Sequence, residues 1–398
     1  MRIRIHMKCN HSFEGIHYLT GEYVTVKVAG ERIVEIEGND CTTLAEKDRI
    51  GKQWIAPGLV DLQINGFKGM DYNTISLTDD VALKVTKALW QEGITSYYPT
   101  VITNSDETIE ALLRNISDSC SQDTDVAQGI AGIHLEGPFI SPEEGPRGAH
   151  SIKYVKAPDW SLFERWQDAA QGKIKIITIS PEWPGAIDFI IKCVEAGIVV
   201  SIGHTNASSE QIAEAVAAGA RMSTHLGNGA HSMLPRHPNY IWDQLVHDEL
   251  WACMIADGFH LPDSVLQVIM KVKGNRAMLV SDAVQLSGLA AGEYDLHIGG
   301  KVVLTVEGKL HLADNPKLLA GSCQMLTWGI GQLVKKRLCS LGDAWEMASV
   351  RPAQFMNLPA QNGLVVGAPA DFVLFDYADN GIEIVQTIKN GQLVYSKE

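Results

Sequence analysis

The sequence predicts an α/β fold of the (β/α)8 TIM-barrel type, with a small β-sandwich domain formed from the N- and C-terminal segments. Three observations lead to this prediction. The middle of the chain alternates apolar strand-like segments with amphipathic helical stretches, and both ends carry short alternating strands. The length of 398 residues suits one large domain with a smaller appendage.

The two ends of the chain show the alternation of antiparallel strands. Near the N-terminus, Val24–Val28 and Arg32–Ile36 alternate apolar and polar residues, and turns are expected at Gly30 and Gly38. Near the C-terminus, Asn390-Gly391 is a hairpin signal between two further strands. We expect three parts: β-domain at 1–56, barrel at 57–360 and the rest of the β-domain at 361–398.

Segments of the middle region read as barrel strands, and their number favours a closed barrel over an open sheet. They are Gly58–Ile64, Ile94–Pro99, Ile130–Leu135, Ile174–Ile179, Ile198–Ile202, Met222–His225, Trp251–Ala256 and Ala277–Val280. A helix is expected to begin after Ser208, because Ser208 and Gln211 match a capping box. Residues 236–244 are expected to form a long loop.

Composition limits the class of protein. The net charge of −14 argues against a nucleic-acid or anionic-membrane partner, although it does not exclude a small anionic substrate. No apolar run approaches the roughly 18 residues of a membrane span, and the start of the sequence lacks the apolar region of a signal peptide. The seven cysteines are scattered without a Cys-x-x-Cys pair, as expected for reduced thiols. We therefore expect a cytoplasmic enzyme.

Polar side chains follow several predicted strands at their C-terminal ends, where barrel enzymes place catalytic groups. Glu136 and His204 each end an apolar segment, and His225 comes one helix-plus-strand repeat after His204. Two imidazoles and a carboxylate leave a coordination position open for water, the pattern of a catalytic zinc site. Each histidine alone could be a hydrogen-bonded core residue, but the three together favour a metal site.

Asp282 ends the last predicted strand. A carboxylate there could take a proton from the attacking water and pass it to a leaving amine. The alternative is a helix N-cap, since aspartate is a preferred capping residue.

Six ordered motifs carry a resemblance. They are Pro57-Gly58-Leu59-Val60-Asp61, His134-Leu135-Glu136-Gly137-Pro138, Gly203-His204-Thr205-Asn206-Ala207, Thr224-His225-Leu226, Ala256-Asp257-Gly258-Phe259-His260 and Ser281-Asp282-Ala283. Together with the later Leu319-Ala320-Gly321-Ser322, they resemble the N-acetylglucosamine-6-phosphate deacetylase family of the amidohydrolase superfamily. The resemblance covers most of the chain and implies deacetylation of an amino-sugar phosphate.

The resemblance also implies roles for individual residues. Glu136, His204 and His225 would hold the metal, Asp282 would be the general acid and base, and His150 would contact the sugar or polarise the amide. Residues implied to bind the substrate are Asn228, Gly229, Arg236, His260 and Ala320. An arginine can bind a phosphate through two hydrogen bonds, although a solvated surface arginine is the alternative for Arg236. Family members are usually homodimers, so a homodimer is expected.

The position of a second metal differs from that of many amidohydrolases, which carry His-x-His after the first strand. Here the residues are Gln63 and Asn65. Neutral amides are weak ligands for a transition metal, so we expect one divalent ion, zinc, and an empty second site.

The sequence leaves the substrate partly open. Gly227 and Gly229-Ala230 depart from the usual family pattern around Asn228, and glycines reshape a loop. N-acetylgalactosamine-6-phosphate, another N-acyl amino sugar, a cyclic amide or an N-acyl amino acid remain alternative substrates. A barrel retained only as a binding protein is a further alternative, but it would be expected to have lost ligands or Asp282.

Overall fold

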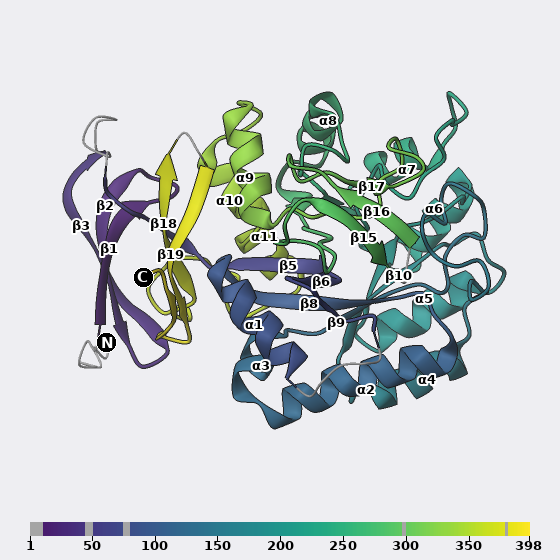
Figure 1. Cartoon of the computed structure of the whole chain (residues 1–398), viewed down its shortest axis with the longest axis horizontal. Coiled ribbons are helices and arrows are strands. Elements are labelled where there is room, and N and C mark those ends of the chain that lie inside the picture. The colour runs from purple at the N-terminus through teal and green to yellow at the C-terminus, as the bar shows by residue number, and fades with distance from the viewer. Residues whose placement is uncertain (1–10, 44–50, 75–79, 297–299, 379–380) are drawn as a thin grey trace. The chain divides into compact units, whose positions relative to one another are not determined.

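The computed structural model describes residues 11–43, 51–74, 80–296, 300–378 and 381–398. The chain forms two compact units (Figure 1). The first contains residues up to 61, 87–96 and 326–398, and the second contains residues 62–86 and 97–325.

A seven-stranded sheet in the first unit joins the two ends of the chain. Its order is β20-β19-β18-β4-β1-β2-β3. The strands are β1 (His11–His17), β2 (Glu22–Ala29), β3 (Arg32–Thr43), β4 (Trp54–Pro57), β18 (Phe372–Ala378), β19 (Gly381–Lys389) and β20 (Gln392–Ser396). Strand β4 links the two halves, because it pairs in parallel with β1 and antiparallel with β18. The two halves share an apolar core that includes Val26, Phe372 and Ile388.

The turns of this sheet follow the sequence signals in two places out of three. Gly30 and Asn390-Gly391 separate paired strands, as predicted. The predicted turn at Gly38 is wrong, because β3 continues through Gly38 and pairs it with Val24 on β2. The register shifts next to this pair, so an irregular ladder, and not a turn, accommodates the glycine.

The first unit also contains three helices after the barrel strands: α9 (Leu326–Lys335), α10 (Leu341–Met347) and α11 (Val350–Phe355). A buried ion pair joins Lys389 Nζ to Asp371 Oδ2 at 2.7 Å. Asp371 Oδ1 accepts a further hydrogen bond from the Asn390 N–H. Both charges are therefore paired inside the unit.

Eight parallel strands form the barrel sheet, which confirms the predicted fold class. Its order is β14-β13-β12-β11-β10-β9-β8-β5. The strands are β5 (Leu59–Ile64), β8 (Ile94–Ile102), β9 (Ile133–Glu136), β10 (Ile174–Ile179), β11 (Val199–Ile202), β12 (Met222–Ser223), β13 (Trp251–Met254) and β14 (Ala277–Leu279). A parallel bridge between Ile64 and Ala283 brings the last segment beside the first strand.

Helices alternate with these strands. They are α1 (Val81–Gln91), α2 (Asp106–Gln122), α3 (Thr124–Gly129), α4 (Trp160–Ala169), α5 (Ala186–Glu195), α6 (Ser209–Ala217), α7 (Tyr240–Val246) and α8 (Asp263–Lys273). The capping box predicted at Ser208 and Gln211 is present at the start of α6. The loop predicted for 236–244 is shorter than expected, because the Asn239 side chain accepts from two backbone N–H groups and starts α7 at Tyr240.

Short strands that the sequence did not signal complete the second unit. Strands β6 (Gly66–Phe67) and β7 (Met70–Asp71) form a hairpin after β5. An antiparallel sheet of β15 (Gly292–Leu296), β16 (Gly300–Leu304) and β17 (Leu310–Leu312) follows β14. No helix in the described part of the chain is long and apolar enough to cross a membrane. The free thiols include those of Cys120, Cys193, Cys253, Cys323 and Cys339.

Candidate metal centre and active site

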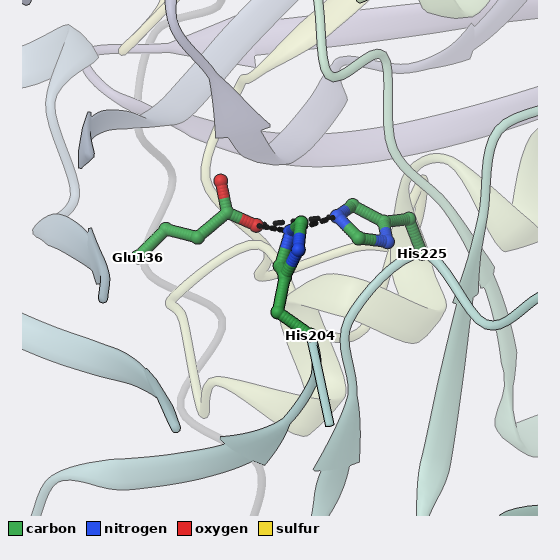
Figure 2. A group of neighbouring side chains, drawn as sticks. All are labelled: Glu136, His204 and His225. Carbon is green, nitrogen blue, oxygen red and sulfur yellow. Dashed lines mark hydrogen bonds and ion pairs between the residues drawn. The ribbon is translucent and has the colours of Figure 1, made fainter. Parts of the chain in front are cut away.

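Three buried side chains converge at the C-terminal end of the barrel sheet (Figure 2). Glu136 is the last residue of β9, and His204 and His225 each stand two residues beyond a strand, β11 and β12. The two Nε2 atoms are 3.1 Å apart, and Glu136 Oε1 lies 3.4 Å from His204 Nε2 and 3.2 Å from His225 Nε2. Their ligand atoms all lie within 4.8 Å of one another, so the group could hold a metal ion.

Hydrogen bonding shows that these atoms fit a cation. The Pro146 carbonyl lies 2.8 Å from His204 Nδ1 and can only accept, so Nδ1 carries the proton and Nε2 keeps its lone pair. A carboxylate oxygen and a lone-pair nitrogen therefore face one another in a buried position, where only a positive charge relieves their repulsion.

The ionisation of the centre also favours a bound positive charge. Burial alone would raise the pKa of Glu136, but the contacts with His204 and His225 hold this pKa well below its usual value. Burial alone would lower the pKa of His225, but the hydrogen bond to Glu136 and the negative charges of Glu136 and Asp282 together outweigh burial and raise this pKa. Glu136 therefore keeps its negative charge, which a bound cation would compensate.

Three polar residues of the centre have unusual backbone conformations. His204, His225 and Asp282 have φ angles of 48°, 26° and 47°, in the left-handed region that non-glycine residues rarely adopt. Such conformations cost of order 1–3 kcal/mol each and persist where the surroundings impose them. The barrel thus turns the chain sharply at three strand ends and directs these side chains inward.

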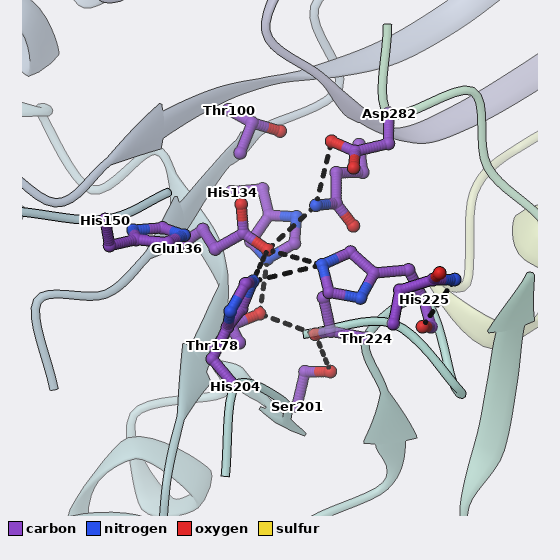
Figure 3. A network of polar contacts seen from close by, with 12 residues as sticks. Thr100, His134, Glu136, His150, Thr178, Ser201, His204, Thr224, His225 and Asp282 are labelled. Carbon is purple, nitrogen blue, oxygen red and sulfur yellow. Dashed lines mark hydrogen bonds and ion pairs between the residues drawn. The ribbon is translucent and has the colours of Figure 1, made fainter. Parts of the chain in front are cut away.

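Asp282 lies beside the cluster, on the segment that meets β5 (Figure 3). Its Oδ1 accepts hydrogen bonds from Asn65 Nδ2 at 2.8 Å and from Gln63 Nε2 at 3.2 Å. Burial, and then the nearby charge of Glu136, raise the pKa of Asp282 to about 6. No helix begins here in the described chain, since turns lead from Asp282 into β15, so the N-cap alternative does not apply.

His150 lies against the cluster from the loop after β9. Its ring meets the His204 ring edge to face, with centroids 4.5 Å apart. Its Nδ1 lies 2.8 Å from the hydroxyl of Thr103, the residue that follows β8. Burial, and then the neighbouring His204, lower the pKa of His150 to about 3, so the imidazole stays neutral.

The residues predicted to bind the substrate differ in how close they lie to the metal cluster. Asn228 Nδ2 donates to the His225 carbonyl at 3.3 Å, and a Cβ atom on Gly229 would stand 2.8 Å from His204 Nδ1, so both adjoin the metal cluster. His260 Nδ1 lies 2.6 Å from Asp257 Oδ2. Arg236 has an exposed side chain, and Ala320 is half-buried beside β17. Among the described residues, no hydrogen bond or ion pair joins Arg236 or Ala320 to the metal cluster.

A pocket of about 440 Å³ lies next to this region, between the start of α6 and the loop that precedes α7. Its lining includes Asn206, His231, Asn239 and Tyr240. His231 is tied to Tyr240 through both its backbone N–H, at 2.8 Å, and its Nδ1, at 3.0 Å. The metal cluster and Asp282 do not line this pocket.

Beneath the metal cluster lies a buried polar chain that sequence reasoning missed (Figure 3). The Leu62 carbonyl accepts from His134 Nδ1 at 3.0 Å, so His134 Nε2 accepts from the Thr178 hydroxyl at 2.7 Å. Burial lowers the pKa of His134 to about 4, which keeps it neutral. Thr178 also meets Thr224, the residue before His225, at 2.7 Å. The alternation of β9 signals His134, because residues 134 and 136 share one face of the strand.

Comparison with known proteins places the chain in a family. The model of the amidohydrolase family matches residues 54–394, and the chain belongs to this family. It is 32% identical to the N-acetylglucosamine-6-phosphate deacetylase of Lysinibacillus sphaericus, over 86% of this chain and 85% of that protein. It is 33% identical to the deacetylase of the same name from Mus musculus, over 92% of this chain and 88% of that protein. The resemblance seen in the six motifs is confirmed.

Solved structures agree with these relatives. A mutant N-acetyl-D-glucosamine-6-phosphate deacetylase from Mycobacterium smegmatis, in complex with N-acetyl-D-glucosamine-6-phosphate, matches with a TM-score of 0.83 and 26% identity. The match covers 97% of this chain and all of that one (100%). The N-acetylglucosamine-6-phosphate deacetylase from Thermotoga maritima matches with a TM-score of 0.80 and 26% identity, over 94% of this chain and 95% of that one.

Proposed function

We propose that this chain hydrolyses the acetamide of N-acetylglucosamine-6-phosphate to give glucosamine-6-phosphate and acetate. The observation that carries the proposal is the buried cluster of Glu136, His204 and His225 with Asp282 beside it. The similarity to deacetylases over most of the chain supports the substrate.

The metal in this proposal is one zinc ion held by Glu136, His204 and His225. When bound, such an ion supplies Lewis-acid chemistry that activates water and polarises a carbonyl group. The position of a second ion is unsuitable, because Gln63 and Asn65 direct N–H groups toward Glu136 and Asp282. Carboxylates cannot donate hydrogen bonds, so the amides must present their NH₂ groups there.

Asp282 is the proposed acid and base. In its ionised form it takes a proton from the attacking water as the water oxygen bonds to the acetamide carbon. It then gives this proton to the amine nitrogen as the C–N bond breaks, which regenerates the carboxylate. The raised pKa of about 6 makes the protonated intermediate form of Asp282 accessible near neutral pH.

His150 is the proposed hydrogen-bond donor to the acetamide oxygen. Its neutral ring has Nδ1 engaged with Thr103, which leaves Nε2 for the substrate. A donor already in place stabilises the negative charge that develops on the oxygen.

For the rest of the substrate we propose contacts with Asn228, Gly229, His260, Ala320 and Arg236. Arg236 suits the phosphate, because guanidinium and phosphate groups form paired hydrogen bonds. A homodimer and a cytoplasmic location complete the proposal. They rest on the family resemblance and on the scattered cysteines.

Acetate release tests the proposal. The metal-loaded protein is given N-acetylglucosamine-6-phosphate, the unphosphorylated sugar and N-acetylgalactosamine-6-phosphate in parallel. We expect rapid, chelator-sensitive release from the first alone. Release from the galactosamine compound would move the assignment to the other epimer, and no release by protein that holds one metal ion would overturn the substrate.

A further inference from the structure

The side chains of Gln63 and Asn65 connect the two buried carboxylates of the active site. Gln63 Nε2 lies 2.9 Å from Glu136 Oε1 and 3.2 Å from Asp282 Oδ1. Asn65 Nδ2 lies 2.8 Å from the same Asp282 oxygen. Gln63 and Asn65 are 1% and 9% exposed, so bulk water does not compete for these hydrogen bonds.

The two carboxylate oxygens of Asp282 differ in the number of hydrogen bonds that they accept. An ionised carboxylate only accepts, and a carboxamide NH₂ group has two hydrogens. The Gln63 NH₂ group can therefore give one hydrogen to each carboxylate, while Asn65 adds a second donor to Asp282 Oδ1. Among the described residues, no hydrogen bond reaches Asp282 Oδ2. This leaves Oδ2 as the oxygen with a lone pair free for a reacting proton.

The backbone of the same segment fixes where Asp282 stands. The Asp282 N–H donates to the Gln63 carbonyl at 2.9 Å, and the Asn65 N–H donates to the Ala283 carbonyl at 2.8 Å. Asp282 itself has a φ of 47°. Hydrogen bonds from the end of β5 thus hold both the backbone and the carboxylate of Asp282. They stabilise a backbone conformation that is unfavourable by itself.

We propose that Gln63 and Asn65 are positioning residues that hold Asp282 through Oδ1 and assign Oδ2 to proton transfer. The inference rests on the proposed function. Oδ2 accepts the proton as an O–H bond of the attacking water breaks, and the Oδ2–H bond breaks as the amine nitrogen gains that proton. The N–H groups on Oδ1 prevent the carboxylate from rotating and exchanging its two oxygens.

The test compares Asn65→Ala and Gln63→Ala with a matched control, Asn73→Ala. Asn73 is also a buried asparagine, and its carboxamide bonds to the Thr100 carbonyl and the Ile102 N–H at 2.9 Å each without touching either carboxylate. Each full-length variant is loaded with metal, and its metal content, thermal midpoint, kcat and KM are measured.

We expect Asn65→Ala and Gln63→Ala to keep one ion per chain and to lose kcat by roughly 10- to 100-fold with little change in KM. Asn73→Ala should keep its kcat even where its thermal midpoint falls. A kcat for Asn65→Ala that falls no further than that of Asn73→Ala would overturn the inference, and so would a loss of activity that only follows loss of metal.

A structural measurement separates this inference from the proposed function. If the unaltered protein releases no acetate, the proposed function fails, and the inference is then decided by crystal structures of the metal-loaded protein, of Asn65→Ala and of Gln63→Ala. We expect the Asp282 carboxylate to turn away from its original plane in the variant. An unmoved carboxylate in Asn65→Ala and in Gln63→Ala would refute the positioning role.

Discussion

The rings of His150 and His204 meet edge to face with their centroids 4.5 Å apart. The proposed hydrogen-bond donor to the acetamide oxygen is therefore in contact with a proposed metal ligand. Replacement of His150 by Gln should therefore test chemistry and metal binding together. We expect kcat to fall about 100-fold, as for loss of one donor to a developing oxyanion, while one ion remains bound. Steady-state kinetics with metal analysis checks this. Unchanged kcat would exclude His150 from the reaction.

Removal of the charge of Glu136 should empty the metal centre. Glu136→Gln keeps the size of the side chain, but it removes the negative charge that faces His204 and His225. We expect the metal content to fall well below one ion per chain and activity to fall with it. Metal analysis after dialysis checks this, with Asp282→Asn as the control that should keep its ion and lose turnover. Full metal content in Glu136→Gln would contradict the assigned ligands.

The pH dependence should show an acidic limb due to Asp282. Its carboxyl must be ionised to take a proton, so the rate falls as the pH drops through its pKa of about 6. A bound cation favours the ionised form and moves the limb to lower pH. We therefore expect kcat/KM to decrease about tenfold per pH unit below a midpoint at or under pH 6. A midpoint above pH 7 would show that another group is the base.

Gly229→Ala should have two effects: it should strain the backbone at residue 229, and it should displace the His204 ring. The new Cβ would stand 2.8 Å from His204 Nδ1, and Gly229 has a φ of 56°. Gly30→Ala is the matched control, because Gly30 has a φ of 58° and nothing within 4 Å of the new atom. Both should lose roughly 1–2 kcal/mol of stability from the left-handed conformation. Only Gly229→Ala should weaken metal binding, and equal metal affinity in the two variants would contradict the crowding.

The buried pair of Asp371 and Lys389 should dominate the polar contribution to the stability of the first unit. Asp371→Asn leaves the Lys389 ammonium buried without its counter-charge. We expect a loss of about 3–5 kcal/mol in the free energy of unfolding. Glu35→Gln, which removes one partner of an exposed pair with Lys27, should cost at most about 1 kcal/mol. Urea unfolding of both variants measures this, and equal losses would show that burial of the pair is unimportant.

Local and periodic features of the sequence were sufficient to predict the barrel. Apolar segments such as Ile174–Ile179 agree with strand β10 at both ends, and the box of Ser208 and Gln211 gives the start of α6. The C-terminal ends of parallel strands lie at one end of a barrel, so Glu136, His204, His225 and Asp282 were expected near one another. The turn predicted at Gly38 was wrong, because pairing with β2 continues the strand there, and the start of α7 was missed, because the Asn239 side-chain cap decides it.

The sequence by itself determined which residue types stand at the strand ends, and therefore the kind of chemistry available. Only the tertiary structure decided which atoms meet. Gln63 and Asp282 are 219 positions apart, and no local pattern predicts that one amide would hold Oδ1 and leave Oδ2 free. Likewise, the bond from His204 Nδ1 to the Pro146 carbonyl sets the tautomer. The physical reason is that a hydrogen bond requires its donor and acceptor to be placed to within a few tenths of an ångström, and only closure of the barrel fixes their positions that closely.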